Sequence, residues 1–190
     1  MNVRFLRAAA LVAALMLGPL TGAHAVQYKQ VNPVASQISF TYTQMGARVY
    51  GTFGKFDATL DFDSANPTAA RAELTIQLDS IDAGTSDANS ELQKPAWFNT
   101  AVYPLAKFES SSVKVLDTNR FQISGKLALK GRTRDVNALV VLKPQHAIGV
   151  FSGEFILNRA DFSIGEGEWA DIGIISNEIL IKFRVVAPEQ

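Results

Sequence analysis

Cysteine is absent from the 190 residues, and histidine occurs only twice. Without cysteine the chain can form no disulfide and offers no thiolate as a nucleophile or a metal ligand. Zinc and haem sites usually need clusters of histidine or cysteine, so neither is expected. His146 stands in a Pro-Gln-His turn, and no Gly-x-Ser-x-Gly motif accompanies it. We therefore predict no catalytic residues and no metal site.

Long apolar runs are also lacking, except at the N-terminus. Two arginines precede an apolar run over residues 8–20, and the small-x-small pattern of a cleavage site ends at Ala25. These features predict a secretory signal peptide over residues 1–25, cleaved after Ala25, and an exported periplasmic domain over residues 26–190. A single membrane anchor is the alternative, but the run is shorter than the ~20 residues that span a bilayer.

No charge of one sign dominates the sequence. Removal of residues 1–25 leaves 16 basic and 18 acidic residues, a net charge near −2. Such a domain lacks the basic surface of a nucleic-acid-binding protein and the polybasic patch that holds proteins on anionic lipid. We predict no nucleic-acid partner.

Period-two alternation of apolar and polar residues recurs through the rest of the chain, which is typical of strands with one buried face. Near the C-terminus, for example, Ile181 and Phe183 alternate with Lys182 and Arg184. Eight strands are predicted in this way, over residues 38–42, 49–62, 72–78, 108–115, 121–129, 136–142, 151–157 and 175–185. Composition alone leaves open an up-and-down barrel or a two-sheet sandwich.

Two of these strands change phase part-way. An inserted residue that bulges from the strand would keep both halves facing the core, and Gly54-Lys55 and Ser110 to Ser112 are the candidate positions. Bulges of this kind let a sheet coil tightly enough to close into a barrel.

The segment from Ser86 to Asn99 does not alternate. Ser86 is predicted to cap a short helix that places Leu92 and Trp97 on one side and covers the barrel. Phe98 and Trp169 also lie outside the strands, and with Trp97 they are candidates for the rim or lid of an apolar pocket.

The interior of an eight-stranded barrel is either filled by side chains or holds one small ligand. Gly125, Ala138 and Gly153 are predicted to face inward, and such small residues favour unfilled volume. Phenylalanine and leucine from opposite strands can instead fill the space. These residues alone do not decide between a filled and a hollow interior.

The loop around Trp169 holds the densest group of acidic residues, Glu166, Glu168 and Asp171. Its simplest interpretation is a solvated turn. Oxygen ligands for calcium and an acid/base pair for hydrolysis are the alternatives. The second alternative defines a competing function for the whole chain, an exported hydrolase that uses carboxylates.

A series of short motifs, in order along residues 36–179, adds a resemblance. They include Ser36-Gln37-Ile38-Ser39-Phe40, Gly51-Thr52-Phe53-Gly54-Lys55-Phe56, Trp97-Phe98-Asn99, Gly125-Lys126-Leu127-Ala128-Leu129-Lys130-Gly131-Arg132-Thr133-Arg134-Asp135-Val136, Arg159-Ala160-Asp161-Phe162-Ser163-Ile164-Gly165 and Asn177-Glu178-Ile179. In these the mature sequence resembles the YceI-like family, the polyisoprenoid-binding proteins with a lipocalin-like barrel. Gln44 and Asn99 depart from the family pattern, which often has His and Asp at these positions, so the resemblance predicts an altered contact with the headgroup or the lid there.

The resemblance implies an all-β fold, an extended eight-stranded antiparallel lipocalin-like barrel with a short capping helix. It also implies a periplasmic binding or carrier protein, not an enzyme, whose interior holds an isoprenoid quinone or a polyprenyl phosphate. The bound isoprenoid lipid is the expected partner, and no cofactor is required. Transient membrane contact and a homodimer are further expectations, the latter because Leu139 and Val141 add apolar side chains to an outer face. A structural or stress-associated barrel without ligand is the remaining alternative.

Alternation predicts which side chains line the interior. They are Phe40, Tyr42, Phe56, Leu60, Ile76, Phe108, Leu127, Val140, Phe155, Ile181 and Phe183. The predicted mouth or lid comprises Trp97, Phe98, Trp169, Arg132 and Arg134. Arg48 and Arg159 are additional candidates to pair with an anionic headgroup.

Overall fold

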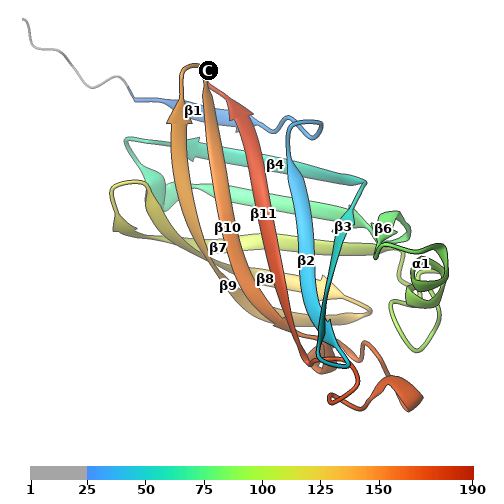
Figure 1. Ribbon diagram of the computed structural model, residues 1–190. Coiled ribbons are helices and arrows are strands. Elements are labelled where there is room, and N and C mark those ends of the chain that lie inside the picture. Colours follow the sequence, from blue (N-terminus) through green and yellow to red (C-terminus); the bar gives the residue numbers. More distant parts are fainter. Residues whose placement is uncertain (1–24) are drawn as a thin grey trace, which may run out of the picture.

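The structure, a computed structural model, describes residues 25–190 and consists mainly of one antiparallel sheet (Figure 1). The predicted signal peptide and its cleavage lie outside the described residues, apart from Ala25. The strands are β1 (Gln27–Gln30), β2 (Gln37–Gln44), β3 (Ala47–Phe53), β4 (Phe56–Asp63), β5 (Arg71–Gln77), β6 (Ile81–Asp82), β7 (Leu105–Asp117), β8 (Arg120–Leu129), β9 (Arg132–Gln145), β10 (Ile148–Asn158) and β11 (Glu178–Pro188). The helices are α1 (Ser86–Leu92) and the short 3₁₀ turns η1 (Pro67–Ala69), η2 (Leu78–Ser80), η3 (Arg159–Phe162) and η4 (Gly167–Trp169).

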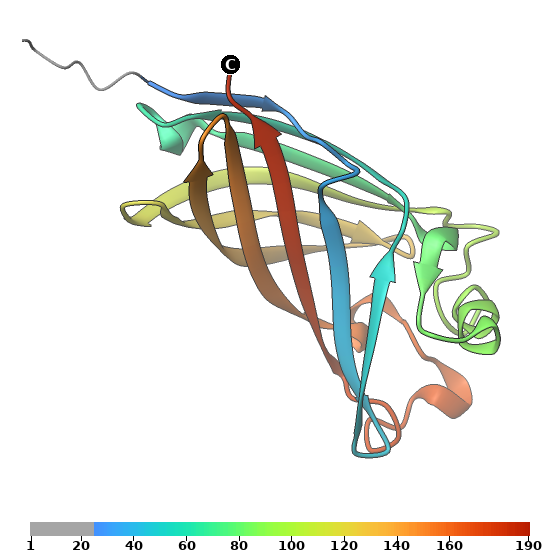
Figure 2. The same ribbon diagram turned by 45° about the horizontal axis from the view of Figure 1, so that its top comes forward.

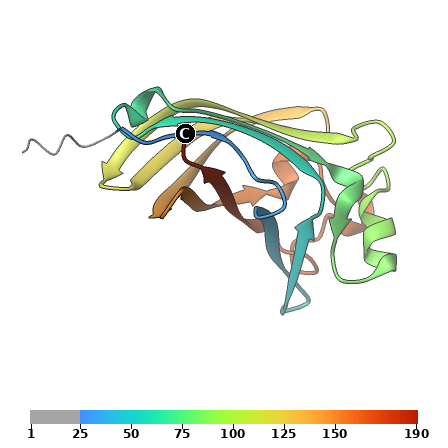
Figure 3. The same ribbon diagram turned by 90° about the horizontal axis from the view of Figure 1, so that it is seen from above.

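The sheet curls into a barrel, with the strand order β1-β4-β5-β7-β8-β9-β10-β11-β2-β3-β6. Strand β1 pairs with β4 and also meets the end of β11, where Tyr28 bridges to Glu189 and the Asn32 amide donates to the Val186 carbonyl at 2.8 Å. Seen from above, β4, β5, β7 and β8 arch over β10, β11 and β2 (Figure 3). The predicted all-β barrel class is therefore confirmed.

The predicted number of strands is wrong, because the sheet has eleven strands and not eight. The segment predicted as one strand over 49–62 is two strands, β3 and β4, separated by Gly54-Lys55. Strands β1 and β6 are additional. They are only four and two residues long, so neither contains enough alternation to be recognised.

The two predicted bulges have different outcomes. Between β7 and β8, Ser110 pairs with Gly125 and Ser112 with Ser124, so Ser111 is the extra residue of a bulge, as predicted. Gly54-Lys55 is instead a break at which the chain changes partners, since β3 pairs with β2 and β4 pairs with β5. The amides of both residues donate to Ser80, at 3.0 Å each.

The space above the inward-facing glycines is filled, contrary to expectation. A Cβ atom on Gly125 would lie 2.4 Å from the Phe108 ring, and one on Gly153 would lie 2.3 Å from the Phe183 ring. Each glycine lets an aromatic ring of the neighbouring strand lie flat against the backbone. These two positions therefore do not supply the open volume of the barrel.

Helix α1 covers one end of the barrel, which the view of Figure 1 places beside β6. Its N-cap is Thr85 and not Ser86, because the Thr85 hydroxyl accepts from the Ala88 amide at 3.2 Å. Among residues 25–190, no helix is long and apolar enough to cross a membrane.

Candidate functional site: an apolar cavity inside the barrel

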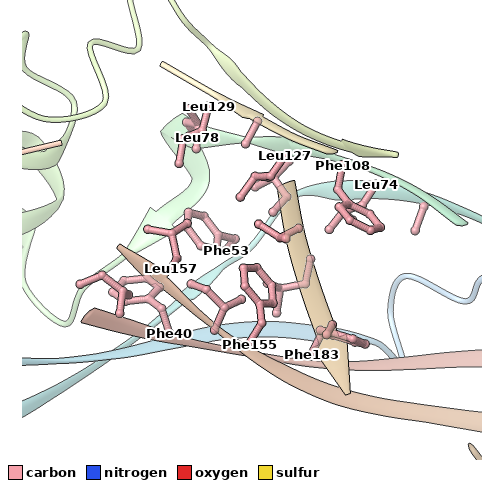
Figure 4. A pocket seen from close by; sticks show the side chains of 18 of the residues that line it. Phe40, Phe53, Leu74, Leu78, Phe108, Leu127, Leu129, Phe155, Leu157 and Phe183 are labelled. Carbon is pink, nitrogen blue, oxygen red and sulfur yellow. The ribbon is translucent and has the colours of Figure 1, made fainter. Parts of the chain in front are cut away.

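The barrel encloses a cavity of about 230 Å³ between two walls of hydrocarbon side chains. One wall is labelled in Figure 4 by Leu74, Leu78, Phe108, Leu127 and Leu129, and the opposite wall by Phe40, Phe53, Phe155, Leu157 and Phe183. A single buried water needs about 10–15 Å³ on a comparable measure. The cavity is therefore more than ten times larger than the space that one water requires. Only Glu73 and Arg159 are charged among the lining residues.

Ten of the eleven side chains predicted to face the interior line this cavity. They are Phe40, Tyr42, Leu60, Ile76, Phe108, Leu127, Val140, Phe155, Ile181 and Phe183. Phe56, the eleventh, begins β4 directly after the Gly54-Lys55 break and packs against the surrounding core without lining the cavity. Contact of these residues with a ligand stays a prediction.

The end of the barrel near β1 is closed by a cluster of aromatic rings. Phe62 packs edge-on against Phe121 and Phe151 at centroid distances of 5.4 and 5.3 Å, and Tyr28 packs edge-on against Phe151 at 5.4 Å. Val140 and Phe151 belong both to this cluster and to the cavity wall. The interior is therefore solid at one end and hollow toward α1, a combination of the two alternatives that the sequence left open.

The α1 end of the cavity is lined by Trp97 and Phe98, two of the residues predicted to form a lid. Trp97 is only 5% exposed, and the Ala96 carbonyl beside it accepts from the amides of Gly165 and Glu166 at 2.8 and 2.9 Å. Trp169 does not line the cavity, but its ring lies against that of Trp97 at a centroid distance of 5.6 Å. Two chain segments are thus joined into one cover over this end.

Arg159 holds this cover together and was not predicted to do so. It is 2% exposed, and its five N–H groups donate to the backbone carbonyls of Ile164, Gly165, Trp169, Ile175 and Ser176 at 2.9–3.1 Å. Burial lowers the pKa of the guanidinium from its usual value. Because every donor is already used, the prediction that Arg159 pairs with an anionic headgroup is wrong.

The other predicted arginines lie outside the cavity. Arg132 and Arg134 are exposed on β9, and Arg134 donates to the carbonyl of Thr133 at 3.0 Å. Arg48 is exposed on β3. None of the three is among the lining residues, although Arg132 lies close enough to Glu166 of the cover to contribute to the lowered pKa of its carboxyl.

The acidic loop has a structural role in the cover. The buried Lys130 ammonium donates to the Ser163 carbonyl and pairs with Glu166 at 3.1 Å. This hydrogen bond from Lys130 lowers the pKa of the Glu166 carboxyl. Asp171 accepts from the Gly173 amide at 2.8 Å within its own turn.

No metal centre is formed within residues 25–190, because no three histidine, cysteine or acidic side chains gather there in a metal-binding arrangement. His146 lies exposed in the turn between β9 and β10. Within the described residues, Glu166, Glu168 and Asp171 are therefore not gathered into the calcium site that the sequence allowed.

The apolar barrel and its cover agree with the comparisons to known proteins. A family model, the YceI-like domain, matches residues 29–187. The chain belongs to the YceI-like family.

Several known proteins resemble the chain over most of its length. Protein YceI of Escherichia coli O157:H7 is 38% identical over 160 residues, which cover 80% of this chain and 81% of that protein. Among solved structures, BcnA of Burkholderia cenocepacia is 34% identical, with a TM-score of 0.81 over 83% of this chain and 99% of its own. A polyisoprenoid binding domain from Saccharophagus degradans is 17% identical, with a TM-score of 0.65 over 88% and 100% of the two chains, and shares the fold.

Proposed function

We propose that this protein binds a long-chain isoprenoid lipid, an isoprenoid quinone or a polyprenyl phosphate, inside the barrel and carries it through the periplasm. The observation that carries the proposal is the cavity wall, which is built almost entirely from aliphatic and aromatic side chains. The polyisoprenoid-binding relative of the same fold and the signal-peptide pattern of the N-terminus support the ligand class and the compartment.

The energetics favour carriage over tight sequestration. Moving an isoprenoid tail from water into such a wall gains roughly 0.8 kcal/mol for each buried CH₂ group. A tail that leaves a bilayer is already shielded from water, so transfer between membrane and barrel is nearly neutral. The protein can therefore release its ligand as readily as it takes it up.

Membrane contact during exchange is also proposed, through a tip beside the α1 end of the cavity. The β2–β3 turn and the loop after η4 lie side by side there (Figure 2), and the Met45 amide donates to the Ile174 carbonyl at 2.8 Å. Met45 and Ile172 are 80% and 64% exposed, whereas the neighbouring Ile175 is buried in the cavity wall. The tip thus joins an exposed apolar surface to the cavity lining.

A cavity-blocking variant tests the proposed function. Ala106 lies in the cavity wall on β7, and the next residue, Lys107, is exposed on the outer face. We expect Ala106→Phe to weaken binding of the apolar fluorophore 1-N-phenylnaphthylamine at least tenfold, because the new ring occupies the space of the ligand. Lys107→Phe should bind as the unmodified protein does.

Circular dichroism verifies that each variant is folded. Should Ala106→Phe unfold, Ala138→Leu on β9 provides a smaller obstruction at another lining position. Equal fluorophore binding by a folded blocking variant and the control would refute the proposal that the ligand lies in this cavity.

A further inference from the structure

The floor of the cavity, at the end that faces β1, is formed by the edge of the aromatic cluster. Phe151 and Val140 belong both to the cluster and to the cavity wall, and Val185 on β11 packs against the cluster and also lines the cavity. Tyr28 and Phe62 lie in the cluster but line no part of the cavity. The open interior therefore ends at this floor, although β10 and β11 stay paired beyond it.

The rings behind the floor are held in place by one another and by the backbone. Phe62 contacts three other rings at centroid distances of 5.3–6.1 Å. The Tyr28 ring is 1% exposed, and its hydroxyl donates to the Glu189 carboxylate at 3.4 Å. A Cβ atom on Gly149 would lie 2.7 Å from this ring, so the ring lies directly against the β10 backbone. Because close-packed rings move aside only at the cost of strain, the floor is a fixed boundary for a ligand.

We propose that this floor sets the longest isoprenoid tail that the protein accepts, with Phe151 and Val185 as the residues that determine the length. A tail that fits leaves a bilayer for an equally apolar wall. A tail with one isoprene unit too many must expose that unit to water, which is unfavourable in proportion to its apolar area. The inference rests on the proposed function and narrows it to isoprenoids below a defined chain length.

A mixture of prenyl methyl ketones with two to nine isoprene units, supplied in phosphatidylcholine vesicles, measures this length limit. All members carry the same head, so only the length of the tail varies. After separation of the protein from the vesicles, mass spectrometry identifies the bound ketones. In the unmodified protein we expect each unit beyond the limit to lower the bound fraction, relative to supply, at least tenfold, because the excess unit lies in water.

Two variants move the floor in opposite directions. Phe151→Ala removes a phenyl ring, which is about as large as one isoprene unit, so the limit should rise by one unit. Val185→Phe adds a ring at the same end of the cavity, so the limit should fall by at least one unit. Leu142→Ala is the matched control, since Leu142 pairs with Phe151 and is buried in the cluster without lining the cavity. Its limit should equal that of the unmodified protein.

Circular dichroism verifies the fold of each variant, and should Phe151→Ala unfold, Val185→Phe still tests the floor. An unchanged limit in either folded variant, or no limit up to nine units in the unmodified protein, would overturn this inference and leave the isoprenoid carrier intact. A rise in Leu142→Ala equal to that in Phe151→Ala would overturn it as well, because loosening of the cluster would then explain both. Failure of every ketone to bind would overturn the proposed function itself.

Discussion

Arg159 is the residue on which the cover over the cavity depends most. A guanidinium has five N–H donors in a fixed planar arrangement, and here each meets a backbone carbonyl between Ile164 and Ser176. These carbonyls belong to a segment with only short 3₁₀ turns, so they would otherwise lack partners. One side chain thus fixes a loop that places Ile164 and Ile175 in the cavity wall.

Replacement of Arg159 tests this role. We expect Arg159→Met to lower the free energy of unfolding by about 3–5 kcal/mol, because it leaves several buried carbonyls unpaired. Arg159→Lys, with a positive charge but a different arrangement of donors, should retain part of this stability. Urea denaturation measures both, and a loss of less than 1 kcal/mol in Arg159→Met would contradict the assigned role.

Single residues differed in how far the sequence could predict them. Alternation places side chains such as Phe108 and Phe155 on the inner face, since inward orientation follows from strand periodicity alone. The filled space at Gly125 and Gly153 depends on the rotamers of rings in neighbouring strands, which no local pattern reveals. The role of Arg159 was missed because carbonyls brought together by loops leave no sequence signal.

Secondary-structure elements were predicted where they are long. The phase change at Ser110 to Ser112 identified a true bulge, because an insertion shifts the alternation by one residue. The similar change at Gly54-Lys55 separates two strands, and only the pairing partners distinguish these cases. In β1, Tyr28 is the only apolar residue, so its burial against the barrel could not be inferred from alternation.

The tip formed by the β2–β3 turn and the loop after η4 provides a test at the scale of elements. We expect the double variant Met45→Gln/Ile172→Glu to slow transfer of a fluorescent prenyl lipid from phosphatidylcholine vesicles about tenfold, because the polar tip no longer enters the bilayer surface. Stability should change by less than about 0.5 kcal/mol, since both side chains are exposed.

The matched control is Leu139→Glu, a change at another exposed apolar residue, which lies on β9. A slower transfer in this control than in the double variant would contradict membrane contact through the tip. Leu139→Glu also tests the predicted homodimer, because Leu139 is one of the two apolar residues on which that prediction rests and is 54% exposed on the outer face. Val141, the other residue, is partly covered.

The whole molecule combines a solid and a hollow half along one barrel. The aromatic cluster of Tyr28, Phe62, Phe121 and Phe151 closes the β1 end and anchors the strands, while the walls separate toward α1. The sequence did not decide between a filled and an empty interior, because the inward alternation of side chains is the same in both. The division between them follows from how the rings pack across the sheet.

Native mass spectrometry of the protein purified without detergent tests the central claim most directly. We predict a population heavier than the polypeptide by the mass of one prenyl lipid, and loss of this added mass after extraction with organic solvent. The added mass should be reduced in Ala106→Phe and retained in Lys107→Phe. A protein that shows only the polypeptide mass, even after incubation with a prenyl lipid, would contradict the account.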